Sequence, residues 1–154
     1  MDNDVFYKIL FEVNEKTQLN EMKKYNHHGK TSVYDHSVSV AILSFYIADK
    51  LGIQDKEDIV IGALLHDYFL YDWRISDVKL HGIKHPRIAL RNAQRELTLS
   101  PLSEDIIVKH MFPLTILPPL YVESWIVSFA DKLCAIHEYL IDSLKNEFID
   151  RRVV

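Results

Sequence analysis

The stretch Ile59-Val60-Ile61-Gly62-Ala63-Leu64-Leu65-His66-Asp67 decides the fold. Its first seven residues leave no polar face, which is typical of a helix surrounded by other helices. His66 and Asp67 follow at the expected end of that helix. A buried carboxylate costs several kcal/mol unless a partner compensates its charge. A divalent cation would do so, but for the dipeptide alone a capping aspartate beside a satisfied core histidine is the favoured explanation.

The rest of the chain predicts an all-α fold in a single domain over residues 1–154. Apolar residues recur every three or four positions, and the sequence holds only four glycines and five prolines. A chain of this length buries one hydrophobic core, and the periodicity predicts a bundle of about six helices. We expect six helices, over 3–15, 33–51, 55–65, 86–97, 100–110 and 121–145. Ser32 is expected to cap the start of the second helix and Gly52 to follow its end, and Asp55 is expected to cap the third. The fourth begins at Pro86 with His85 as N-cap, and the fifth starts at Ser100 or Ser103 and ends at His110.

Composition excludes several classes of function. The 18 basic and 22 acidic residues give a net charge of -4 and form no long basic block, which disfavours nucleic acid as a partner. A single cysteine excludes an intrachain disulfide framework and a cysteine-rich zinc site. We expect no signal peptide, no membrane partner and, by default, a cytoplasmic location.

Two further residues, His36 and Asp131, favour a metal-binding role for the His66-Asp67 pair. His36 shares a helical stripe with Val40, Leu43 and Ile47, so its imidazole points with the core-facing side chains. Asp131 follows an apolar run over 125–130, where an unpaired carboxylate would be unfavourable. Each residue alone has a structural explanation, but together they form a set of imidazole and carboxylate ligands.

The order His36, then His66-Asp67, then Asp131 within Phe-Ala-Asp-Lys resembles the HD superfamily of metal-dependent phosphohydrolases, over about residues 32–138. The resemblance implies an HD-domain helical bundle in which these four residues bind a divalent metal. It also implies catalytic roles for His66 and Asp67.

A second resemblance extends the ligand set. The segment 81–89, with its His-Pro step, is similar to the corresponding segment of dinuclear HD members, and His110 stands where their next ligand histidine lies. This implies a second ion on His85 and His110, with Asp67 bridging the two. As alternatives, His85 is an N-cap and His110 a histidine stabilised at a helix C-terminus. The segment after Asp67 departs from the phosphodiesterase signature, which disfavours cyclic-di-GMP.

The implied reaction is hydrolysis of a nucleotide, a dinucleoside polyphosphate or a similar small phosphoester, with one or two divalent transition metal ions (Fe, Mn, Ni, Co or Zn) as cofactor. A catalytically silent metal- or nucleotide-binding regulatory module and a di-iron HD oxygenase are the alternatives. The last helix can serve a homodimer as well as the core. Substrate phosphates are expected to contact four residues, each of which is otherwise an ordinary surface or helix-start residue: Lys30, His81, Arg87 and Lys132.

Two other groups lie near these motifs. His27 and His28 precede the His36 helix and either line the mouth of the site or belong to an exposed loop. The aromatic stretch 68–73 directly follows Asp67. It either stacks on a nucleobase or closes the core.

Overall fold

The computed structural model describes residues 3–27 and 29–150. Within these ranges the chain forms no strand, only one antiparallel bridge between Asn26 and Ser32, which confirms the all-α prediction. Over the same ranges no helix is long and apolar enough to cross a membrane. The helical elements, in chain order, are α1 (Asn3–Lys16), the 3₁₀ helix η1 (Leu19–Lys24), α2 (Val33–Leu51), α3 (Lys56–Leu65), α4 (His81–Glu96), α5 (Pro101–Lys109) and α6 (Val122–Asp150).

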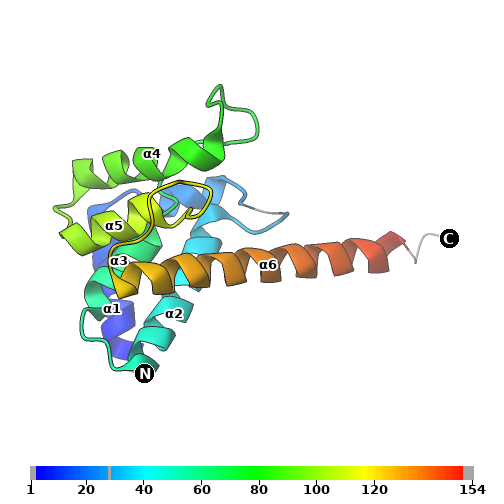
Figure 1. Ribbon diagram of the computed structural model, residues 1–154. Coiled ribbons are helices and arrows are strands. Elements are labelled where there is room, and N and C mark those ends of the chain that lie inside the picture. Colours follow the sequence, from blue (N-terminus) through cyan, green and yellow to red (C-terminus); the bar gives the residue numbers. More distant parts are fainter. Residues whose placement is uncertain (1–2, 28, 151–154) are drawn as a thin grey trace.

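Helix α3 is the centre of the bundle, as its apolar sequence predicts. It contacts α1, α2, α4, α5 and α6 (Figure 1). Five of its side chains are completely buried, namely Ile59, Val60, Ala63, Leu64 and Leu65. Gly62 allows the close approach of α5, because a Cβ atom at this position would lie 2.7 Å from Cγ2 of Ile106. His66 and Asp67, which directly follow α3, therefore lie in the interior of the protein.

The predicted signals at the ends of α2 and α5 are confirmed. Ser32 Oγ accepts a hydrogen bond from the Asp35 amide at 3.0 Å, and Ser100 Oγ accepts one from the Ser103 amide at 3.0 Å. Gly52 ends α2 in the left-handed conformation with φ of 71°. Asp55 does precede α3, but its side chain makes no capping hydrogen bond.

Two expected helix ends were wrong, and one helical element was missed. Helix α4 begins at His81 rather than Pro86, because the amides of Ile83 and Lys84 close its first turn on the Leu80 carbonyl, so His85 is no N-cap. Pro86 lies inside the helix, where its nitrogen has no hydrogen to donate to the backbone ladder. Helix α6 continues to Asp150, beyond the expected end near residue 145. The 3₁₀ helix η1, with Leu19 and Met22 buried, was not predicted.

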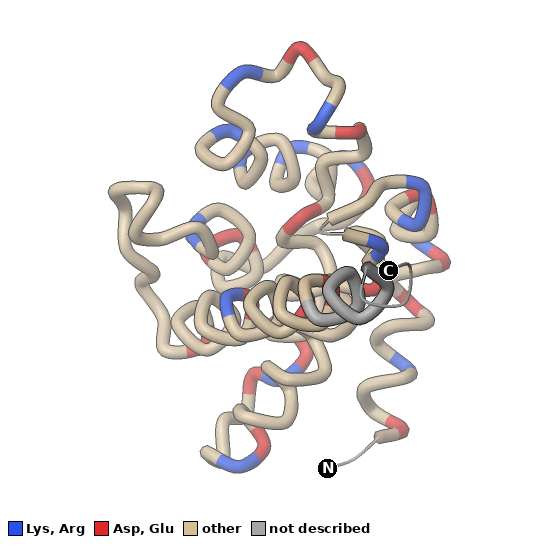
Figure 2. Tube along the Cα trace, turned by 90° about the vertical axis from the view of Figure 1, so that its right-hand side faces the viewer, with Lys and Arg blue, Asp and Glu red and all other residues tan. Residues whose placement is uncertain are grey.

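Charged side chains are mixed over the described part of the molecule. Figure 2 shows Lys and Arg interspersed with Asp and Glu along most elements. Such a distribution does not create the continuous basic track that a phosphate backbone needs.

Candidate metal centre

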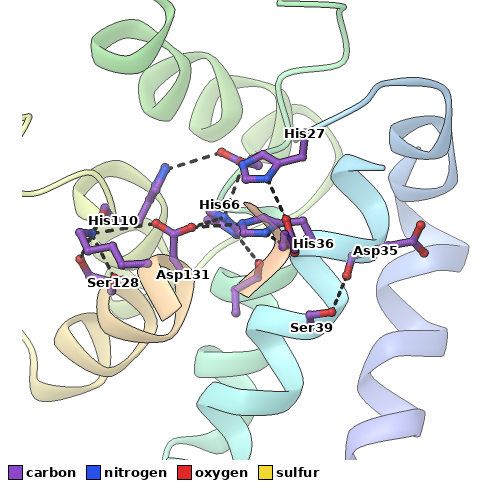
Figure 3. Close-up of polar contacts among 12 residues, drawn as sticks. His27, Asp35, His36, Ser39, His66, His110, Ser128 and Asp131 are labelled. Carbon is purple, nitrogen blue, oxygen red and sulfur yellow. Dashed lines mark hydrogen bonds and ion pairs between the residues drawn. The ribbon is translucent and has the colours of Figure 1, made fainter. Parts of the chain in front are cut away.

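Five segments bring their histidines and aspartates to one buried place. His36 comes from α2, His66 and Asp67 from the end of α3, His85 from α4, His110 from the end of α5, and Asp131 from α6. All six are buried, and Asp131, the most exposed, retains 7% of its surface. In Figure 3, His36, His66 and Asp131 converge on one point. The structure thus brings together every residue that the sequence predicted as a metal ligand.

Backbone carbonyls orient three of the imidazole rings. Nδ1 of His66 lies 2.7 Å from the Ala63 carbonyl oxygen, Nδ1 of His85 lies 3.0 Å from that of His81, and Nδ1 of His110 lies 2.8 Å from that of Ile107. Because a carbonyl only accepts, each Nδ1 must carry the proton. The Nε2 atom of each neutral ring then offers a lone pair, the form in which histidine binds metals.

The carboxylate of Asp67 lies between two sets of these nitrogens. Its Oδ1 is 3.0 Å from His85 Nε2 and 3.6 Å from His110 Nε2. Its Oδ2 is 3.6 Å from His66 Nε2. Of the three compact groups of potential ligand atoms in the described residues, two contain this carboxylate, one of His36, His66 and Asp67, the other of Asp67, His85 and His110; the third is formed by His27, His36 and Glu138. Asp67 belongs to the first two.

Asp131 completes the first group. Its Oδ1 is 3.1 Å from His36 Nε2 and 3.7 Å from His66 Nε2. The side chain enters from α6, the last helix in sequence, and faces residues of α2 and α3. Two histidines and two carboxylates therefore surround one side of the centre.

Burial and neighbouring charges set the protonation of the centre. Burial raises the pKa of Asp67 and of Asp131, but the surrounding histidines outweigh it and hold both values below the usual range. Burial, together with the neighbouring His66 and His85, lowers the pKa of His110 to about 3, and burial also lowers that of His66. The protein thereby favours ionised carboxylates beside neutral His66 and His110, the forms in which both residue types bind metals. Burial also lowers the pKa of His85, but the Asp67 carboxylate outweighs it and raises that pKa.

Two features show that divalent cations fit here. His66 Nε2 is buried and has no hydrogen-bond partner, since the nearest carboxylate oxygens lie beyond hydrogen-bond distance. His85 Nε2 and His110 Nε2 lie only 2.8 Å apart although both rings are already protonated at Nδ1, so a proton or a cation must separate their lone pairs. Nitrogen and oxygen donors of this kind suit Zn, Fe, Ni, Co and Mn.

Sequence reasoning missed Glu138, which supports His36 from behind. Its Oε1 lies 3.0 Å from His36 Nδ1, and its Oε2 lies 3.3 Å from His27 Nδ1. Although burial by itself lowers the pKa of His36, hydrogen bonds to Asp131 and Glu138 raise it to about 10. Glu138 follows Asp131 by two helical turns and shares its face, which is the signal that would have identified it.

His27 lies over the first group of ligands. Its ring stacks on that of His36 with centroids 3.7 Å apart, and its Nε2 is 3.5 Å from Asp67 Oδ2. It also lines the cavity beside the centre. The structure therefore supports a place for His27 at the mouth of the site and not in an exposed loop. His28 lies outside the described residues.

The cavity opens onto the second ligand group and has a volume of about 700 Å³. Asp67, His85, His110 and Asp131 lie on its inner side, and its outer wall is mostly apolar, formed by Trp73, Met111, Pro113, Leu114 and Ala135. The Trp73 and His81 rings are stacked, with centroids 5.5 Å apart and planes 18° from parallel.

Two of the four residues predicted to contact substrate face this cavity. His81 lines it, with Nδ1 2.9 Å from the Tyr71 hydroxyl. Lys132 lines it too, and its ammonium donates to the His110 carbonyl at 2.8 Å. Lys30 lines a separate cavity between α2 and α6, and Arg87 is exposed on α4 and does not line the first cavity.

The aromatic stretch after Asp67 divides between core and cavity. Tyr68 and Phe69 are buried in the core, and the Tyr68 hydroxyl donates to Glu96 at 2.6 Å. Trp73 is the member that lines the cavity. Closing the core is therefore confirmed for Tyr68 and Phe69, and stacking on a nucleobase stays a prediction, for Trp73.

Fold and site together define an all-helical domain with a buried centre of histidines and aspartates suited to divalent metals. Residues 33–136 match the family model described as the HD domain, and the chain therefore belongs to the HD-domain family. No curated protein matches the chain. The crystal structure of the HD domain of the L. monocytogenes phosphodiesterase PgpH, in complex with cyclic-di-AMP, aligns with a TM-score of 0.49 and 16% identity over 92% of this chain and 84% of that one. Family membership and the buried ligand clusters support a metal-dependent phosphohydrolase.

Proposed function

We propose that the chain hydrolyses a small phosphoester with two divalent cations, one held by His36, His66, Asp67 and Asp131, the other by Asp67, His85 and His110. The observation that carries this proposal is the convergence of Nε2 atoms on both oxygens of a single buried carboxylate. Metals held in this way lower the pKa of bound water and neutralise charge on phosphoryl oxygens.

The protein's own contribution is to hold these ligands still before the substrate arrives. The backbone carbonyls behind His66, His85 and His110 set the tautomer and the ring direction, and Glu138 does the same for His36. The centre therefore needs little reorganisation during the reaction. Lys132, tied to the His110 carbonyl, places one positive charge at the cavity wall, where it can contact a phosphate oxygen.

The cavity favours a substrate with one phosphate attached to a flat, apolar group, such as a nucleotide. Its volume of about 700 Å³ suits a ligand of that size. Burial lowers the pKa of His81 to about 4, so the ring stacked on Trp73 is neutral and Lys132 is the one lysine or arginine among the lining residues. A dinucleoside polyphosphate would bring several negative charges to a wall that offers few cations, which makes it the weaker candidate.

Metal analysis combined with a substrate panel tests the proposal. We expect about two metal ions per chain in the parent, and a loss of metal from both positions in Asp67→Asn. Asp77→Asn, which changes an exposed aspartate in the following loop, is the matched control and should keep the parent's metal. The parent should cleave nucleoside monophosphates or simple aryl phosphates.

Other outcomes would replace the proposal with an alternative. Two metals without turnover of any phosphoester in the panel would point to a silent binding module. Oxygen consumption by the iron-loaded protein would point to an oxygenase. Unchanged metal content in Asp67→Asn would refute the shared role of this carboxylate.

A further inference from the structure

Helix α6 is apolar on the face that it turns away from the bundle as well as on the face that it buries. Its inner side packs on α2 and α5 through residues such as Val127 and Ala130, which are completely buried. Its outer side carries six large apolar residues with exposed fractions between 40% and 63%. These residues, which we call the outer stripe, are Val122, Trp125, Phe129, Leu133, Ile136 and Leu140.

The outer stripe is one straight line of side chains. Its members are spaced by three, four, four, three and four residues. At about 100° per residue they fall within roughly 80° of one another around the helix, over a length of about 27 Å. A helix face lined with large apolar residues is normally buried against another element. The stripe therefore has the character of an interface.

The stripe is large enough for a specific interface. If a large apolar side chain offers about 150 to 250 Å², the exposed fractions leave roughly 600 Å² per chain. Two such surfaces would bury about 1,200 Å², the lower limit for stable association. Leu117 and Leu120, exposed by 60% and 75%, continue the apolar surface just before the helix. None of the six stripe residues is charged. Contact between two stripes therefore buries no charged side chain of the stripe.

The order of residue sizes favours a second copy of the chain as the occupant. In an antiparallel pair centred on position 131, Phe129 of each copy faces Leu133 of the other, and Trp125 lies within one residue of the level of Ile136. Val122 and Leu140 then face each other at the two ends. Each aromatic ring meets an aliphatic side chain, and the same surface serves both partners, as a two-fold interface requires.

We propose that two copies of this chain form an antiparallel dimer through the outer stripe of α6. Figure 1 shows α6 running along one side of the bundle and extending past it. Asp131, Lys132 and Ala135 lie on the same helix and line the cavity. The dimer would therefore steady the element that carries them.

Sedimentation velocity of the full chain at micromolar concentrations tests this proposal without any activity measurement, so its outcome is independent of the proposed function. The parent should sediment with twice the 18.0 kDa mass of one chain. Phe129→Asp should raise the dimer dissociation constant by at least about 30-fold, because a central aromatic anchor is lost. Phe11→Asp is the matched control, since Phe11 is similarly exposed, on α1, and this variant should stay dimeric.

A second variant distinguishes loss of the dimer from loss of the fold. Leu140→Asp changes the end of the stripe, away from the core, and should also weaken the dimer while circular dichroism shows unchanged helix content. A monomeric parent would overturn the proposal. So would folded Phe129→Asp and Leu140→Asp variants that keep the parent's mass, because another surface would then hold the copies together.

Discussion

Replacing Glu138 by glutamine removes one charge from the support of His36 and keeps the size of the side chain. The Glu138 carboxylate accepts from His36 Nδ1 at 3.0 Å and lies 3.3 Å from His27 Nδ1. A hydrogen bond to a charged group contributes about 1.5–3 kcal/mol and a neutral one about 0.5–1.5 kcal/mol. The difference, about 1–1.5 kcal/mol, corresponds to roughly a tenfold change in an equilibrium constant. With the contact to His27 added, we expect metal affinity to fall by about 10- to 100-fold.

Competition with a chromogenic chelator measures that affinity directly. Glu123→Gln provides the matched control, because Glu123 is half-buried in the first turn of the same helix, outside the ligand groups, and should leave metal affinity unchanged. The thermal midpoint of the metal-free protein shows whether the fold is intact. If Glu138→Gln bound metal as tightly as the parent, the reasoning that Glu138 orients His36 toward a cation would be refuted.

Two further changes test the cavity and the core. Trp73→Leu should raise KM for a nucleotide or aryl phosphate by about 5- to 30-fold, because stacking on an aromatic ring contributes about 1–2 kcal/mol. Trp73→Phe keeps an aromatic ring and should retain most of the affinity. Equal KM values for the parent and both variants would exclude Trp73 from the substrate site. Gly62→Ala places a Cβ atom 2.7 Å from Ile106, and should lower the free energy of unfolding by about 1–3 kcal/mol in urea titrations. An unchanged midpoint would show that α3 and α5 do not approach so closely.

The candidate site was predictable to the extent that its residues break a local pattern. His36 and Asp131 stand on apolar helix faces where a polar residue needs a partner, and the His66-Asp67 pair ends an entirely apolar helix. Such conflicts between residue and surroundings are visible without a structure. Glu138 breaks no such pattern, because it lies beyond the apolar run that precedes Asp131. Its spacing of two helical turns from Asp131 indicates a shared face, but its contact with His36 appears only when α2 packs beside α6.

Predictions based on nearness in sequence were less successful. Arg87 is two residues from His85, yet two residues correspond to about 200° around a helix, so the two side chains leave α4 in opposite directions. Lys30 lies near His27 in sequence, but its backbone amide donates to Asp142 of α6 and its side chain lines the other cavity. Distance along the chain does not specify direction in space.

Local physics in the sequence determined the helices, most of their ends and the identity of the buried ligands. Periodicity, capping residues and the cost of burying an unpaired charge act over a few neighbouring residues, and each can be read from a short stretch. The tertiary structure alone decided that one carboxylate, Asp67, faces His66 with one oxygen and His85 and His110 with the other. It also decided that the helix of Asp131 keeps an apolar face uncovered. Both outcomes depend on the angles at which α3, α4, α5 and α6 pack, which are set by contacts between residues far apart in the chain.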